Sequence, residues 1–118
     1  MRRASHLSLE LQRIGDASVV SARGDIDLST VAKAAEAIAA ARANRGSVYL
    51  DLREVGFMDT SGLRLIIEEQ QHTAAHGYGF RVFPGPPNVQ RLFDIAGLAG
   101  DEGLFADPSR LPSAGGSG

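Results

Sequence analysis

Apolar and polar residues alternate at the start of the chain, which predicts a β-hairpin. Leucines occupy every second position from residue 7 to residue 11, with polar residues between them. This period of two is typical of a strand that buries one face. Gly15 and Asp16 favour a tight turn, and residues 17–22 follow as a second strand. The segment 24–27, Gly-Asp-Ile-Asp, is expected to end that strand.

Further along the chain, three amphipathic helices alternate with two short apolar strands. The predicted elements are a helix at 30–43, a strand at 47–52, a helix at 61–76, a strand at 80–83 and a helix at 88–97. Asp27 or Ser29 is expected to cap the first of these helices and Asn88 the third. Residues 57–62 are expected to form a turn, and residues 104–105 are a candidate edge segment.

The order of these elements predicts one α/β domain over residues 1–111. Its sheet should be mixed but mostly parallel, with four or five strands, an N-terminal hairpin and three or more helices. Strand–helix–strand steps call for parallel, right-handed crossovers. Residues 112–118 contain only Pro, Ser, Ala and Gly, so we expect them to be a disordered tail.

Composition narrows the function without naming it. The chain has 118 residues, 43% of them hydrophobic, and a formal net charge of −2, which argues against an electrostatic nucleic-acid binder. It has no cysteine, so disulfides and thiolate metal sites are excluded. No apolar run approaches the roughly 18 residues that a membrane helix needs. We expect a soluble, cytoplasmic domain that does not insert into a membrane.

The histidines do not form a convincing catalytic or metal site. His72 and His76 are four residues apart on one predicted helix face, but no third histidine follows to complete a metal site. Ser61 and His72 lie 11 positions apart on one helix, about 16 Å along its axis, which excludes a triad with Asp59. No phosphate-binding glycine loop or dinucleotide fingerprint is present. We therefore expect no enzyme activity, cofactor or metal.

The segment Asp59-Thr60-Ser61-Gly62 carries the most information. Asp, Thr and Ser are all good helix-start residues, and one cap would suffice. The segment can therefore be read as a helix cap with redundant residues. It can also be read as an exposed turn whose hydroxyl accepts a phosphate. The residues alone leave both readings open.

The helix after this segment has two faces. Leu63, Ile66, Ile67, Gln70 and Ala74 share the face expected to meet the sheet. Leu65 points to the opposite side, which also carries Ser61, Glu68, Glu69 and His72. A leucine beside a switch hydroxyl is a candidate anchor for a partner protein.

Four segments together resemble the STAS domain, and more closely the bacterial anti-sigma factor antagonists. They are Gly24-Asp25-Ile26-Asp27, Asp51-Leu52, Phe57-Met58-Asp59-Thr60-Ser61-Gly62-Leu63 and Leu92-Phe93-Asp94-Ile95-Ala96-Gly97-Leu98. The resemblance covers roughly residues 7–107. It implies an α/β domain that binds an anti-sigma factor, itself a serine/threonine kinase. Binding in the unphosphorylated state releases the sigma factor, phosphorylation ends binding, and a serine/threonine phosphatase resets the switch.

Carried over by position, the phosphorylated residue is Thr60, with Ser61 as second choice. The partner-binding residues expected around the phosphorylation turn are Asp25, Asp27, Asp59, Thr60, Ser61, Gly62, Leu65 and Glu68. The chain departs from the family pattern by having Thr where the best-known antagonists have Ser. It also stops short of the usual terminal helix, because Pro112 forbids more than a turn there. The oligomeric state, monomer or homodimer, stays open.

Two other functions remain as alternatives. STAS domains also act as scaffold or regulatory subunits of signalling or membrane-transport complexes, without a phosphorylation switch. An unrelated enzyme that uses Asp25 and Asp27 as a carboxylate pair is the third hypothesis. Only the switch hypothesis predicts that a negative charge at residue 60 abolishes partner binding.

Overall fold

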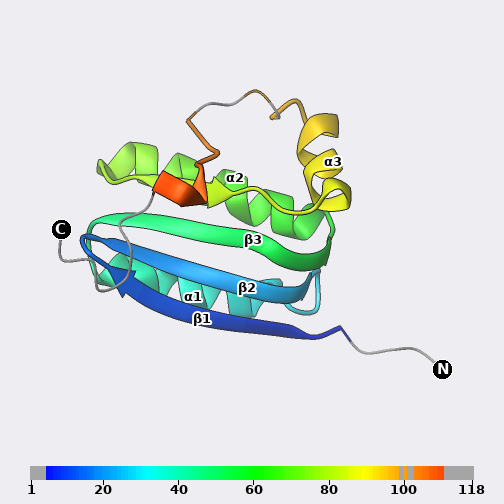
Figure 1. Ribbon diagram of the computed structural model, residues 1–118, viewed down its shortest axis with the longest axis horizontal. Coiled ribbons are helices and arrows are strands. Elements are labelled where there is room, and N and C mark those ends of the chain that lie inside the picture. The colour runs from blue at the N-terminus through cyan, green and yellow to red at the C-terminus, as the bar shows by residue number, and fades with distance from the viewer. Residues whose placement is uncertain (1–4, 99, 101–102, 111–118) are drawn as a thin grey trace.

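The sheet has four strands in the order β1-β2-β3-β4. The computed structural model describes residues 5–98, 100 and 103–110. The strands are β1 (Leu7–Ile14), β2 (Ala17–Ile26), β3 (Ser47–Met58) and β4 (Phe80–Phe83). β1 and β2 are antiparallel, whereas β2, β3 and β4 are parallel (Figure 1). This confirms the predicted mixed, mostly parallel sheet with an N-terminal hairpin.

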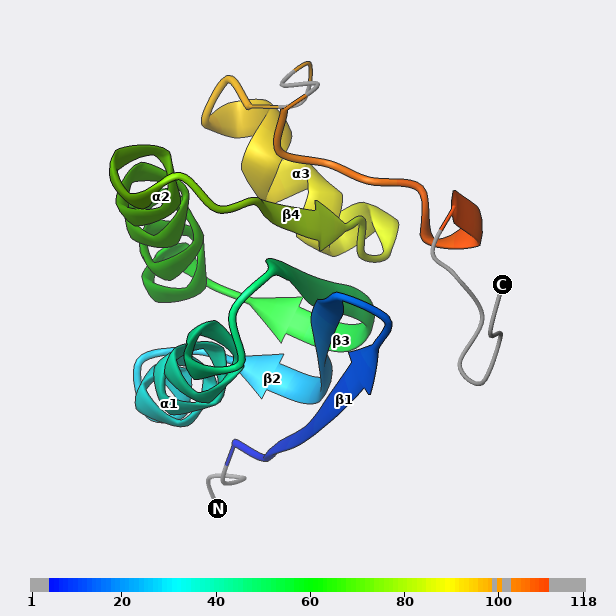
Figure 2. The same cartoon turned by 90° about the vertical axis from the view of Figure 1, so that its left-hand side faces the viewer.

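Helices cover one face of this sheet. The helices are α1 (Val31–Ala43), α2 (Thr60–His76) and α3 (Pro87–Ile95), followed by a short 3₁₀ turn (Pro108–Arg110). α1 and α2 lie side by side on the same face of the sheet (Figure 2), as expected for successive crossovers of one hand. The core between these layers contains Val20, Ile38, Leu50, Leu52, Ile66, Val82 and Phe93, all at most 1% exposed.

The hairpin forms where the sequence predicts it. Gly15 has φ 59°, and Ile14 pairs with Ala17 across the two-residue turn. The alternation of leucines along β1 does not bury all of them, because β1 is the edge strand. Leu7 is 2% exposed, whereas Leu11 is 40% exposed.

Two strands are longer than the sequence predicts. Residues 24–26 continue β2 instead of ending it, and residues 57–58 belong to β3 instead of a turn. Asp25 pairs with Phe57 and Ile26 with Met58, with two register irregularities along β2. Parallel pairing with a distant segment therefore overrides the local turn preference of Gly and Asp.

The sequence predicts the ends of α2 correctly but not the N-caps of α1 and α3. α2 begins after Asp59 and ends at Gly77, whose φ is 78°, as expected. The N-cap of α1 is Thr30, instead of Asp27 or Ser29. The N-cap of α3 is Pro86, because Pro87 begins the helix.

Two smaller features complete the fold. Asn88 lies inside α3, where its side-chain amide donates a 2.8 Å hydrogen bond to the Gly56 carbonyl. Phe105 forms a bridge with Val82, in keeping with the predicted edge segment. The predicted tail at 112–118 lies outside the described residues. Within the part of the chain that the structure describes, no helix is long and apolar enough to span a membrane.

The buried face of α2 differs from the predicted one at its C-terminal end. Glu69, expected to face away from the sheet, is 6% exposed, and Thr73 is 4% exposed, whereas Ala74 is exposed. The Glu69 Oε2 atom lies 3.5 Å from Arg42 Nε and accepts a 3.1 Å hydrogen bond from the Tyr78 hydroxyl. A carboxylate can be buried there because it is paired with Arg42 of α1 and hydrogen-bonded to Tyr78, which follows α2.

His72 belongs to the same cluster. Its Nε2 atom lies 2.8 Å from Arg42 Nη1, so the ring is anchored instead of being a freely solvated surface side chain. Burial, followed by the nearby Glu69 carboxylate, raises the pKa of Tyr78 above its ordinary value of 10.0. The cluster therefore ties the C-terminal halves of α1 and α2 together.

Glu69→Ala is expected to lower the free energy of unfolding by about 1–3 kcal/mol, because Arg42 loses its ion-pair partner and the Tyr78 hydroxyl loses its acceptor. Urea denaturation measures this change, with the exposed Gln71→Ala as the matched control expected to stay within about 0.5 kcal/mol. Equal stabilities of the two variants would show that the cluster adds nothing.

Candidate functional site

A groove between α1 and α2 is the best-formed candidate site. It has a volume of about 460 Å³. Its lining residues are Leu28, Val31, Ala32 and Ala35 from α1 and the turn before it, and Thr60, Ser61, Arg64, Leu65 and Glu68 from α2. Leu28 is 82% exposed. The groove thus has an apolar floor and, on the α2 side, hydroxyl and charged groups.

The two hydroxyl residues at the start of α2 have different environments. The Ser61 hydroxyl and backbone N–H both bond to the Asp59 carboxylate, the N–H at 2.8 Å. Asp59 is thereby the N-cap of α2. Thr60 is exposed, and within the described residues no group hydrogen-bonds its hydroxyl. The cap therefore needs Asp59 and Ser61 but leaves Thr60 free.

Gly62 fixes the start of α2 against the ends of β2 and β3. A Cβ atom there would lie 2.5 Å from Met58 Cγ and 2.9 Å from Ile26 Cγ2. The Asp59 N–H also donates a 3.1 Å hydrogen bond to the Ile26 carbonyl. The turn that presents Thr60 is therefore held rigidly on the sheet.

Asp25 and Asp27 do not line this groove. Asp25 lies in β2 opposite Phe57, and its backbone carbonyl accepts a 2.8 Å hydrogen bond from the Thr30 hydroxyl. The Asp27 carboxylate accepts a hydrogen bond from the Ser5 hydroxyl and another at 2.9 Å from the Ser29 N–H. These contacts give Asp27 a structural role in the turn before α1.

The hydroxyl of Ser5, and after it that of Ser29, holds the pKa of Asp27 below its ordinary value of 3.8. A carboxyl whose pKa is lowered by folding stabilises the protein above the unfolded pKa, and this contribution is lost as the pH falls through the folded pKa. The destabilisation caused by Asp27→Asn is therefore expected to be full near pH 6 and to shrink below about pH 4. Urea denaturation across this range measures the effect.

Ser29→Ala provides the matched control, because it removes one donor and should weaken the same pH dependence. A destabilisation by Asp27→Asn that is constant from pH 6 to pH 3 would contradict this role of the carboxylate.

Several groove residues were not predicted from the sequence. The residues that line the groove and were not predicted as site residues are Leu28, Val31, Ala32, Ala35 and Arg64. The predicted site residues that do line it are Thr60, Ser61, Leu65 and Glu68. Leu28 carries one usable signal, because it is an apolar residue in a segment expected to be a polar loop. No local sequence pattern predicts that α1 packs beside α2.

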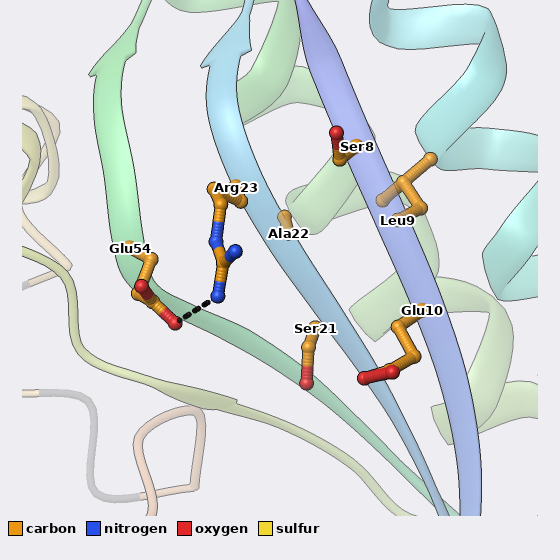
Figure 3. Close-up of a pocket in the computed structure, with 7 residues that line it drawn as sticks. All are labelled: Ser8, Leu9, Glu10, Ser21, Ala22, Arg23 and Glu54. Carbon is orange, nitrogen blue, oxygen red and sulfur yellow. Dashed lines mark hydrogen bonds and ion pairs between the residues drawn. The ribbon is translucent and has the colours of Figure 1, made fainter.

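A second hollow lies on the face of the sheet opposite α1 and α2. It has a volume of about 260 Å³ and is lined mainly by polar residues of β1, β2 and β3 (Figure 3). Arg23 and Glu54 pair there at 3.0 Å, with side chains 71% and 64% exposed. Because this pair neutralises its own charge and five of the seven lining residues are polar, the hollow is the weaker candidate for an apolar docking surface.

The described residues offer no grouping of three His, Asp or Glu side chains that could hold a metal ion. The chemical features of the groove are therefore its apolar side chains, the charged Arg64 and Glu68, and one free hydroxyl, that of Thr60.

Comparison with known proteins points to one family. Residues 8–109 match the family model of the STAS domain. A solved anti-sigma factor antagonist from Mycobacterium paratuberculosis is 24% identical, with a TM-score of 0.71, and the match covers 88% of this chain and 89% of that one.

Two solved forms of the SpoIIAA protein are also similar. The unphosphorylated anti-sigma factor antagonist SpoIIAA is 20% identical, and the match covers 86% of this chain and 90% of that one, with a TM-score of 0.66. The phosphorylated form of the Bacillus cell fate determinant SpoIIAA is 19% identical, with coverage of 86% and 94% and the same TM-score of 0.66. At these identities the likeness demonstrates a shared fold.

Proposed function

Because the chain belongs to the STAS domain family, we propose that it is a cytoplasmic anti-sigma factor antagonist. In its unphosphorylated state it binds an anti-sigma factor that is also a serine/threonine kinase, and this binding releases the sigma factor. The observation that carries the proposal is the exposed, unbonded Thr60 hydroxyl on the wall of an apolar groove.

Binding is assigned to the groove between α1 and α2. Leu28 and Leu65 supply apolar contact area, and Ala32 and Ala35 allow a partner side chain to approach the helix surface closely. Apolar burial at the centre and polar groups at the edge are the arrangement of a protein interface. Glu68 lies at the edge and favours a basic group on the partner.

The kinase then uses the antagonist as its substrate. The Thr60 oxygen attacks the γ-phosphorus of ATP, a new O–P bond forms, and the bond to the β-phosphate oxygen breaks to leave ADP. The hydroxyl proton passes to a base of the kinase or to water. Ser61 is the weaker acceptor, because its hydroxyl already bonds to the Asp59 carboxylate.

Phosphorylation ends binding by local electrostatics. A phosphate adds about −1.5 to −2 charges beside Asp59 and on the same groove as Glu68. The fold tolerates this charge, because a phosphate at a helix start lies at the positive end of the helix dipole. Hydrolysis of the phosphate by a serine/threonine phosphatase restores the binding form.

A pull-down with three baits tests this function: wild type, Thr60→Ala and Thr60→Glu. We expect an ATP-binding kinase with anti-sigma activity on the first two baits and not on Thr60→Glu, with eluates identified by mass spectrometry. Retention of the same partner by all three baits would identify a scaffold whose Thr60 has no switch role. Capture of proteins without such a kinase would contradict the proposed partner.

A further inference from the structure

Arg64 lies one helical turn beyond Thr60 on the same side of α2. Both residues line the groove, and residues four apart on a helix have Cβ atoms about 5–6 Å from each other. Side chains on a helix lean towards its N-terminus, so Arg64 leans over the turn that carries Thr60. The two side chains are thus within reach of each other.

Among the residues that the structure describes, Arg64 has no ionic partner. Ion pairs join Arg23 to Glu54, Arg42 to Glu69 and Arg53 to Asp51, and Arg64 takes part in none of them. Arg64 is exposed and is the one cationic residue among the residues that line the groove in the described chain. A free guanidinium therefore stands beside the free hydroxyl.

The chemistry of the two groups is complementary after phosphorylation. A guanidinium presents parallel N–H donors that match two phosphate oxygens. An acidic group placed four residues before a basic one is the favoured order on a helix. Glu68 follows Arg64 by four residues, which is the less favoured order, and carries one negative charge instead of nearly two. The phosphate is therefore the stronger partner for Arg64.

We propose that Arg64 binds the phosphate of phosphorylated Thr60 and thereby closes the groove at its α2 wall. This inference rests on the proposed function, which supplies the phosphate. Phosphorylation then has two effects on the partner, because it adds negative charge and also removes the cation of the groove from the partner's reach. Arg64 is a positioning residue in the switched-off state and takes no part in phosphoryl transfer.

The test uses the full chain with phosphothreonine incorporated at residue 60 during synthesis, so no kinase is needed. A ³¹P NMR titration gives the midpoint of the second proton dissociation of the phosphate. We expect this midpoint to be about 0.3 pH unit lower in the phosphorylated wild-type protein than in phosphorylated Arg64→Gln, since a nearby cation favours the dianion. The difference should shrink at 1 M salt.

Two further variants separate capture from a general charge effect. In Arg64→Lys the midpoint of the phosphate should lie between those of wild type and Arg64→Gln, because an ammonium keeps the charge without the paired donors. In Arg45→Gln, whose changed residue follows the C-terminal end of α1, the phosphate should have the same midpoint as in wild type. ¹H–¹⁵N spectra of all variants confirm that each is folded.

Equal midpoints in wild type and Arg64→Gln would overturn the inference. So would an equal shift in Arg45→Gln. Neither result would bear on whether an anti-sigma factor binds the unphosphorylated groove, because that is decided by the pull-down with the Thr60 variants.

Discussion

Phosphorylation of Thr60 is expected to weaken binding of the anti-sigma factor by at least 100-fold. The Thr60→Glu variant should bind the anti-sigma factor at least about 10-fold more weakly than wild type. The effect is smaller than that of the phosphate because Glu carries one charge and the phosphate nearly two. Thr60→Ala should bind within about 3-fold of wild type, since the Thr60 hydroxyl makes no bond to the described residues that its removal would break.

Coulomb's law accounts for this magnitude. Two like charges about 6 Å apart repel by about 0.7 kcal/mol in water and about 3 kcal/mol at an effective dielectric constant of 20. A partner that covers the groove lowers the local dielectric constant around the phosphate, Asp59 and Glu68. A 100-fold loss requires about 2.8 kcal/mol, which lies inside this range for a dianion.

Isothermal titration calorimetry with the purified anti-sigma factor measures these affinities. Gln71→Glu is the matched control, because it adds one negative charge to an exposed position of α2 about 16 Å along the helix from Thr60. It should bind within about 2-fold of wild type, and the Thr60→Glu effect should diminish at high salt. Incubation with the kinase and ATP should label wild type and Ser61→Ala but not Thr60→Ala.

Two results would contradict this prediction. If phosphorylated protein bound the anti-sigma factor as tightly as unphosphorylated wild type, phosphorylation of Thr60 would not act as a switch. Backbone chemical-shift changes that extend far from Thr60 would replace the local electrostatic switch with a conformational one.

Most of the fold follows from local patterns in the sequence. The alternation along β1, the Gly15 turn and the left-handed Gly77 at the end of α2 are each set by a few neighbouring residues. Such signals survive folding because the backbone itself requires them. The number and order of strands and helices therefore match the prediction.

The differences arise where a distant segment decides the outcome. Asp25 and Phe57 lie within strands because they pair with each other across 32 positions of sequence. Glu69 is buried because Arg42 and Tyr78, from outside α2, satisfy its carboxylate. A helix-face pattern counts apolar residues and has no means of predicting such partners.

For the same reason, the sequence predicted the α2 wall of the candidate site but not the α1 wall. The motif Asp59-Thr60-Ser61-Gly62 is continuous in sequence, so it reveals the hydroxyl and its cap. Leu28, on the opposite wall of the groove, lies more than 30 residues earlier and comes near Thr60 only through the packing of α1 beside α2. The structure adds the distinction between the bonded Ser61 and the free Thr60, which depends on hydrogen-bond geometry.

Gly62→Ala is expected to destabilise the protein by about 1–2 kcal/mol, although Gly to Ala within a helix ordinarily stabilises by up to about 1 kcal/mol. The clash decides the sign, because a Cβ atom would lie 2.5 Å from Met58 Cγ and 2.9 Å from Ile26 Cγ2. Overpacking of this kind costs about 1–3 kcal/mol. Because α2 must move outward to relieve the clash, Thr60 moves with it, and binding of the anti-sigma factor should weaken as well.

Urea denaturation and titration calorimetry measure the two effects of Gly62→Ala. Gly56→Ala is the matched control near the site, because its Cβ atom would meet only Asp25 Oδ1, at 4.0 Å, and stability and binding should be preserved. Adding Met58→Ala to Gly62→Ala frees the space that the new methyl group needs. The double variant should therefore be at least about 1 kcal/mol more stable than the sum of the single changes predicts. Additive losses would mean that contact with Met58 does not hold the start of α2 in place, and the rigid presentation of Thr60 would need another cause.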